Sequence, residues 1–209
     1  LPISLSTELN VFADFYPQLP ESCKSCRSLL LANINPSLQM QVLNQVSGYS
    51  HLACDTMNYW IYLCPKEIEQ VLRRVNIVFM NEDEVREYTN KENIYSAARE
   101  ILSLGPQWII VKRGEYGSVA ISNDDMYFAP AYPLEEVKDP TGAGDSFAGA
   151  FMGYLANHNI LNRAVIKEAI LYGTVVLALN VADFSVKGLI DKTKAEIDVN
   201  KEQLVKWTT

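Results

Sequence analysis

The sequence predicts an α/β fold with a doubly wound, mainly parallel sheet flanked by helices. Short apolar runs bounded by turn residues alternate with amphipathic segments over most of the chain, which is the order of β-α units. A hairpin with glycines at turn positions follows at 108–122. Two long helices with apolar faces come next, near 145–157 and 163–180. Parallel strands need long crossover connections, so helices are expected to cover the sheet.

The first half of the chain contains two strands, each followed by a helix. Residues 28–32 (SLLLA) form a continuous apolar run, and the helix over 36–45 opens at a proline, which suits the first helical turn. Residues 51–54 (HLAC) give a second strand that ends at Asp55. In 65–75 the apolar side chains recur at helical spacing, which predicts an amphipathic helix.

Later elements follow the same alternation. A helix starts at the acidic residues 82–84, and another spans 95–104 and stops at Gly105-Pro106. The remaining strands are expected at 77–80, 108–112, 118–122 and 126–132. Since no repeat, low-complexity tract or linker separates these elements, residues 1–209 are predicted to form a single domain.

Composition limits the class of partner. The chain has 209 residues, of which 48% are hydrophobic and 21% charged, with a net charge of -7. This acidic balance argues against nucleic acid, because phosphate contacts need clustered Lys and Arg. No apolar run in the sequence reaches the length of a bilayer span, so no membrane partner is expected.

The pair Cys23 and Cys26 has the C-x-x-C spacing of zinc and redox sites. No second such pair completes a zinc set, and His51 and His158 lie far apart in the sequence. Reduced thiols in a cytoplasmic protein are the favoured interpretation, with a metal or redox protein as the alternative.

The segment Asp139-Pro-Thr-Gly-Ala-Gly-Asp145 is the most informative part of the chain. Gly142 and Gly144 allow a turn with exposed backbone amides, and an amphipathic helix is expected to begin at Asp145. Free amides and the positive end of the helix dipole then meet at one point. The pattern therefore predicts a site for a phosphate or a developing negative charge.

In this interpretation Asp145 is the general base of a phosphoryl transfer, and the amides of Gly142, Ala143 and Gly144 hold the transferring oxygens. The alternative is that Asp145 only caps a helix. Two other phosphate motifs are excluded: no Gly-Lys-Ser/Thr of a P-loop occurs, and position 147 is Phe where a dinucleotide fingerprint requires Gly.

At these residues the chain resembles the ribokinase-like, or PfkB, carbohydrate kinase family, whose second signature matches residues 139–145. Asn81-Glu-Asp-Glu84 resembles the family's N-x-x-E motif, which implies that Asn81 and Glu84 order magnesium-bound phosphates. By the same resemblance Lys112 and Gly114 contact ATP. The resemblance also implies that Asp55 lies near the phosphates and that Asn180 lies in the adenine wall.

The resemblance implies an ATP-dependent sugar kinase that uses Mg²⁺, with K⁺ as a further ion at a loop containing Asp139 and Thr141. It begins about a third of the way into the family pattern, so the N-terminal part and the β lid are expected to be absent. Because the lid commonly forms the family's dimer contact, the resemblance implies a homodimer through that missing part.

Two alternatives remain open. The acceptor could be a nucleoside or a vitamin of the pyridoxal or hydroxymethylpyrimidine type, as for other kinases of the superfamily. The chain could instead be a non-catalytic nucleotide-binding module, although a pure binder would not need the Asp145 carboxylate facing an anion site.

Overall fold

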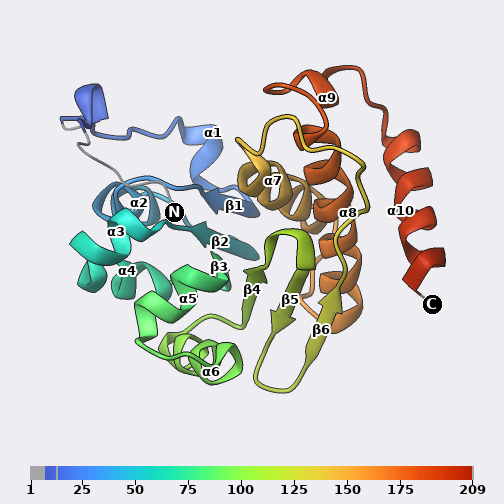
Figure 1. Ribbon diagram of the computed structural model, residues 1–209. Coiled ribbons are helices and arrows are strands. Elements are labelled where there is room, and N and C mark those ends of the chain that lie inside the picture. The colour runs from blue at the N-terminus through green and yellow to red at the C-terminus, as the bar shows by residue number, and fades with distance from the viewer. Residues whose placement is uncertain (1–7, 13, 209) are drawn as a thin grey trace.

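Six strands form one sheet whose spatial order follows the chain, β1-β2-β3-β4-β5-β6, in a computed structural model that describes residues 8–12 and 14–208 (Figure 1). The strands are β1 Ser28–Leu31, β2 His51–Asp55, β3 Ile77–Asn81, β4 Trp108–Lys112, β5 Ser118–Ile121 and β6 Met126–Ala129. The first four strands are parallel to one another. β5 pairs antiparallel with β4, and β6 pairs antiparallel with β5. The mainly parallel sheet with a late hairpin is therefore confirmed.

The connecting helices all lie on one face of this sheet (Figure 1). They are α2 Pro36–Leu43, α3 Asn58–Leu63, α4 Pro65–Leu72, α5 Glu82–Thr89 and α6 Ile94–Leu104. Sequential parallel strands joined by right-handed crossovers require this arrangement. The buried core of this layer includes Leu43, Leu72, Val78 and Ile101.

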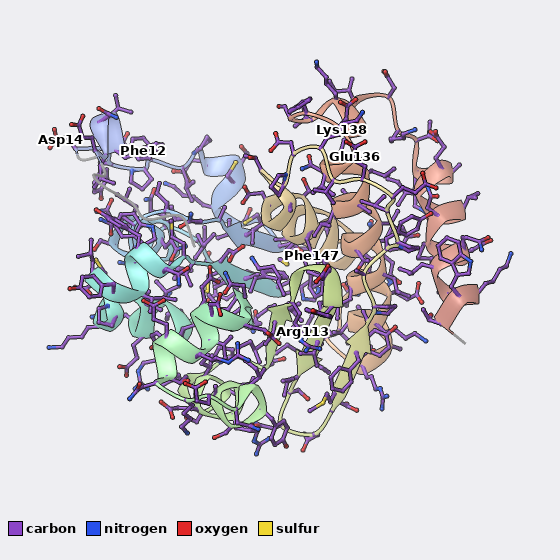
Figure 2. The ribbon with its side chains drawn as sticks, viewed as in Figure 1. Phe12, Asp14, Arg113, Glu136, Lys138 and Phe147 are labelled. Atoms are coloured by element: carbon purple, nitrogen blue, oxygen red, sulfur yellow. The ribbon has the colours of Figure 1, made fainter. Side chains whose placement is uncertain are left out.

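The opposite face is covered by the C-terminal helices α7 Ala143–Leu155 and α8 Arg163–Val181, so helices flank both faces as expected (Figure 1). Phe147 and Phe151 of α7 meet Phe79 of β3 edge-on, with ring centroids 6.1 and 5.2 Å from that of Phe79. Phe147, labelled in Figure 2, thus fixes the first turns of α7 on the sheet. Such aromatic pairs contribute beyond their buried area.

Several elements, most of them short, were not expected from the sequence. They are η1 Asn10–Phe12, α1 Glu21–Lys24, α3, η2 Gly114–Tyr116, α9 Lys187–Ile190 and α10 Lys194–Thr208. Of these, α10 packs along α8, where Tyr172 donates a hydrogen bond to Asp198 and Lys201 pairs with Glu168. These contacts hold the end of the described chain against the core.

The helix α8 meets the length and composition criteria for a membrane span, the one such helix among the described residues. Lys167 and Glu168 interrupt the apolar stretch of α8, so this finding does not contradict the expectation that no apolar run reaches bilayer length. In the structure 56% of this apolar stretch is buried, because α8 packs against α7, β6 and α10. Its apolar side chains are thus accounted for as those of a core helix.

The crossing of α7 and α8 depends on Gly173, because a Cβ there would lie 2.9 Å from Cδ2 and 3.0 Å from the backbone oxygen of Phe147. We predict that Gly173→Ala lowers the free energy of unfolding by about 1–3 kcal/mol, the usual effect of overpacking. Gly153→Ala, where an added Cβ meets nothing within 4 Å, should stabilise by roughly 0.5–1 kcal/mol. Chemical denaturation of both variants tests this, and equal stabilities would contradict it.

Candidate functional site

Three neighbouring strands end in polar residues at the same edge of the sheet. β2 ends at Asp55, β3 at Asn81 and β4 at Lys112, and Asn81 pairs with Lys112 in the register of β3 and β4. The carboxyl ends of parallel strands are where ligands gather in open α/β sheets. The first turn of α7 lies over the same edge, as shown below by its distance to Lys112.

Lys112 and Asp55 form a largely buried ion pair. The Lys112 ammonium donates to both carboxylate oxygens of Asp55, with Nζ–Oδ2 and Nζ–Oδ1 distances of 2.9 and 3.2 Å. The Asp55 side chain is 6% exposed and that of Lys112 is 19% exposed. The backbone amide of Thr56 also donates to Asp55 Oδ1. The pair thus holds the ammonium at a fixed position beneath α7.

Gly144 places α7 directly over this pair. A Cβ at Gly144 would lie 3.2 Å from Lys112 Nζ and 4.0 Å from Asp55 Oδ2. The helix begins at Ala143 after Gly142, whose φ of 79° lies in the left-handed region that suits glycine. The expected start at Asp145 is therefore two residues late. Asp145 occupies the third helical position, in the first turn, and is exposed.

The free amides of this turn differ from those expected. The Ala143 amide donates to the Pro140 carbonyl oxygen at 3.2 Å, so it is already used. Over residues 8–12 and 14–208, the amides of Gly142, Gly144 and Asp145 have no hydrogen-bond acceptor. These unpaired amides, the positive end of the α7 dipole and the Lys112 ammonium provide the chemistry of an anion site.

Asn81 and Glu84 form a reciprocal capping box at the start of α5. The Asn81 backbone N–H donates to Glu84 Oε2 and the Glu84 backbone N–H donates to Asn81 Oδ1, both at 2.8 Å. Glu84 is only 5% exposed. Burial raises the pKa of its carboxyl from 4.5 to about 7, against the lowering effects of the Asn81 hydrogen bond and the Lys112 charge.

The glycine-rich turn is fastened to the end of α8. Asn180 is 2% exposed, and its side-chain amide donates to the Thr141 carbonyl oxygen at 3.0 Å. Asn180 thus has a partner in the turn, and its expected contact with the nucleotide stays a prediction. The Thr141 amide donates to Asp139 Oδ1, and hydrogen bonds from Thr141 lower the pKa of the Asp139 carboxyl.

The turn after β4 has the predicted form. Gly114 and Gly117 have φ values of 57° and 83°, as a G-x-x-G turn requires. Sequence reasoning missed the neighbouring Arg113, whose Nε donates to Glu82 Oε1 at 2.5 Å and joins this turn to the start of α5 (Figure 2). Opposite charges after two adjacent predicted strands are the signal that could have indicated this pair.

The C-x-x-C pair of the sequence, Cys23 and Cys26, is not part of a metal-binding cluster among the described residues. Cys23 and Cys26 are free cysteines. In the part of the chain that the structure describes, no cluster of three or more His, Cys, Asp or Glu side chains is placed to hold a metal ion.

Comparison with known proteins identifies the family. Residues 26–191 match the pfkB family of carbohydrate kinases, and the chain belongs to that family. Cytidine kinase of Thermococcus kodakarensis is 33% identical over 141 residues, which cover 65% of this chain and 50% of the relative. Deoxyribokinase of Salmonella typhimurium is 35% identical over 81 residues, which cover 39% of this chain and 26% of that protein. The chain thus spans about half the length of the cytidine kinase.

Solved structures agree on the fold. Nucleoside kinase of Methanocaldococcus jannaschii superposes with a TM-score of 0.72 at 18% identity, covering 93% of this chain and 60% of that one. Aminoimidazole riboside kinase of Salmonella enterica, solved with aminoimidazole riboside and an ATP analogue, gives 0.70 at 19% identity, covering 87% and 64%. The predicted ribokinase-like fold is therefore confirmed.

The raised pKa of Glu84 predicts a pH-dependent stability. Between pH 4.5 and about 7 the unfolded state loses this proton while the folded state keeps it, so the contribution of Glu84 is lost as the pH rises. Glu84→Gln keeps the capping acceptor and removes the titration. We expect the difference in unfolding free energy, variant minus parent, to increase by about 3 kcal/mol from pH 4.5 to 7.5.

Denaturant titrations at the two pH values measure this difference. The same substitution at Glu202, an exposed residue of α10, controls for the loss of one carboxylate. A difference that is identical at both pH values would show that Glu84 titrates normally.

Proposed function

We propose that this protein is an ATP- and Mg²⁺-dependent kinase that phosphorylates a hydroxyl group of a sugar or of the sugar part of a nucleoside. One observation carries the proposal: the Lys112 ammonium lies 3.2 Å from the position of a Gly144 Cβ, beneath the free amides at the start of α7. Family membership supports a kinase. The names of the relatives support a sugar or nucleoside acceptor.

The γ-phosphoryl group of ATP is assigned to the space over Gly144. The amides of Gly144 and Asp145 and the Lys112 ammonium would bind its oxygens. Since Gly144 has no side chain, the phosphoryl group can approach the backbone closely. Fixed donors of this kind stabilise the charge of the transition state without reorganisation. The open turn at Gly114 would contact the rest of the nucleotide.

Asp145 is assigned as the general base. It lies in the first turn of α7, is exposed, and therefore can face an incoming hydroxyl group. The acceptor oxygen forms a bond to the γ-phosphorus as the bond from that phosphorus to the bridging oxygen breaks. The hydroxyl proton passes to the Asp145 carboxylate, and ADP leaves. A weak base suffices, because a loose transition state releases this proton late.

The acidic groups fit the ions that this reaction would use. Mg²⁺ usually binds one or two carboxylates, water and substrate phosphates, and Glu84 lies close enough to Lys112 and Asp55 for their charges to act on the pKa of its carboxyl. Glu84 would hold the ion, with Asn81 orienting its carboxylate, and Mg²⁺ would neutralise phosphate charge. K⁺ near Asp139 and Thr141 stays a prediction of the family resemblance. The organisation of 1–209 as one domain stays a prediction from the sequence.

The role of Asp145 predicts a separation of binding from catalysis. Asp145→Asn should lower kcat by at least about 100-fold, the usual scale for loss of a general base. Binding of a non-hydrolysable ATP analogue should persist, because removing a negative charge beside the phosphates does not weaken their attraction. Steady-state assays with a panel of sugars and nucleosides, together with thermal shifts, measure the two effects.

Asp124→Asn is the matched control, since Asp124 is an exposed residue of the β5–β6 turn. It should behave like the parent in both assays. Full activity of Asp145→Asn would refute the assignment of the base.

A further inference from the structure

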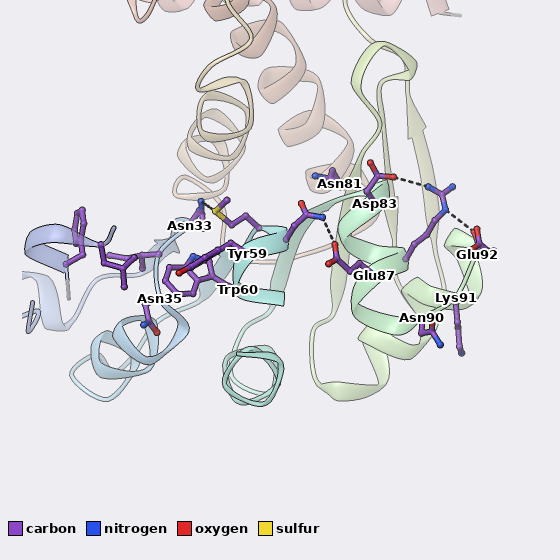
Figure 3. Close-up of a pocket in the computed structure, with 16 residues that line it drawn as sticks. Asn33, Asn35, Tyr59, Trp60, Asn81, Asp83, Glu87, Asn90, Lys91 and Glu92 are labelled. Atoms are coloured by element: carbon purple, nitrogen blue, oxygen red, sulfur yellow. Dashed lines mark hydrogen bonds and ion pairs between the residues drawn. The ribbon is translucent and has the colours of Figure 1, made fainter. Parts of the chain in front are cut away.

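A large cavity lies beside the proposed phosphate site and takes no part in the phosphoryl transfer proposed there. It has a volume of about 1020 Å³ and lies at the ends of β1, β2 and β3, on the side of α3 and α5 (Figure 3). Its size is at the upper end of the range for small-molecule sites. Asn81 lines it and also pairs with Lys112 in the sheet, so the cavity begins next to the anion site.

The charges around this cavity offset one another. Its cations are Arg86 and Lys91, and its anions are Asp83, Glu87 and Glu92. Arg86 is paired with Asp83, and its guanidinium also donates to the Glu92 carbonyl oxygen. Phosphate recognition needs positively charged side chains that are not already paired with carboxylates. The cavity therefore favours a neutral ligand over an anionic one.

Several polar groups facing the cavity have unused hydrogen-bonding capacity. Trp60 is 7% exposed, and its indole N–H has no acceptor among the residues described. The Asn33 amide donates only to the sulfur of Met57, at 3.0 Å, and a thioether is a weak acceptor. Asn35 and Asn58 each use one end of their amide, on the Ser37 backbone and on Glu87 respectively. These donors and acceptors suit a ligand rich in amide, ring-nitrogen or hydroxyl groups.

Aromatic rings form one wall of the same cavity. Tyr59 and Trp60 of α3 meet edge to face, with centroids 4.8 Å apart, and Phe12 contributes from the N-terminal segment. Figure 3 shows Tyr59 and Trp60 side by side, with Asn33 near the sulfur of Met57. Aromatic faces beside amide groups are the means by which proteins bind unpaired nucleobases.

We propose that this cavity holds the base of a nucleoside acceptor, whose sugar hydroxyl extends past Asn81 to the phosphoryl-transfer site. This inference rests on the proposed kinase function and narrows its acceptor from sugars in general to nucleosides. The base stacks on the ring of Tyr59. It hydrogen-bonds to the ends of the Asn33, Asn35 and Asn58 side-chain amides that have no strong partner in the protein. The sugar lies toward Lys112 and α7, where the phosphoryl group is transferred.

Isothermal titration of the full chain with adenosine, guanosine, cytidine, uridine and free ribose, without ATP, tests this assignment. At least one nucleoside should bind, and more tightly than ribose. Tyr59→Ala should weaken that binding by about tenfold or more, the scale of base stacking on an aromatic ring. Tyr62→Ala is the matched control, because Tyr62 lies in the same helix, is 79% exposed and does not line the cavity.

Equal affinity of the parent and Tyr59→Ala for every nucleoside would overturn the assignment, as would phosphorylation of ribose as efficient as that of any nucleoside. If Tyr59→Ala fails to fold, Asn33→Ala, at an exposed position, replaces it with the same expected direction. These measurements are separate from the kinase chemistry. Phosphorylation of a sugar by a protein that binds no nucleoside would overturn the cavity assignment alone. Nucleoside binding lost in Tyr59→Ala, without turnover by the parent, would support the cavity and refute the kinase function.

Discussion

The ion pair of Lys112 and Asp55 is the interaction around which the site is built. Its partners come from β4 and β2, on either side of β3, and lie beneath the first turn of α7. An ammonium group so nearly buried would be unfavourable without a carboxylate partner, since an unpaired buried charge costs several kcal/mol. Asp55 therefore offsets the cost of burying the ammonium and holds it in place, where it can meet phosphate oxygens.

The rest of the fold brings α7 to this pair and holds it there. Phe147 packs on Phe79, and the absence of a side chain at Gly173 lets α8 lie close to Phe147. Asn180 fastens Thr141 to the end of α8. The amides of Gly144 and Asp145 are thus positioned by core packing on one side and by a buried hydrogen bond on the other, which is the preorganisation that phosphoryl transfer requires.

Local patterns in the sequence were sufficient for the strands, for the helices α2 and α4 to α8, and for the glycine turns. The pattern of 77–80 predicted β3, for example, and the glycines at 114 and 117 do adopt positive φ. The start of α7 at Ala143 could not be predicted, because glycine and alanine at its first positions carry no capping side chain. The helix α3 was missed because its six residues are too few to show a helical period.

Most residues of the candidate site were proposed from the sequence, but their contacts could not be. Asp55 and Lys112 are 57 positions apart, and only the sheet order brings them together. The burial of Asn180 and the bond of the Ala143 amide to Pro140 likewise depend on tertiary packing, which no local pattern encodes.

The central claim, that the Gly144 amide and the Lys112 ammonium bind the same phosphoryl group, is tested most directly by titrating Gly144→Ala with a non-hydrolysable ATP analogue. Gly149→Ala in the same helix is the control, because a Cβ there meets nothing within 4 Å, whereas at Gly144 it would press on Lys112 Nζ. The account predicts that Gly149→Ala binds like the parent and that Gly144→Ala, still folded, binds at least about tenfold more weakly, a loss of about 1.4 kcal/mol. Parent-like affinity of a folded Gly144→Ala would contradict it and place the phosphate elsewhere.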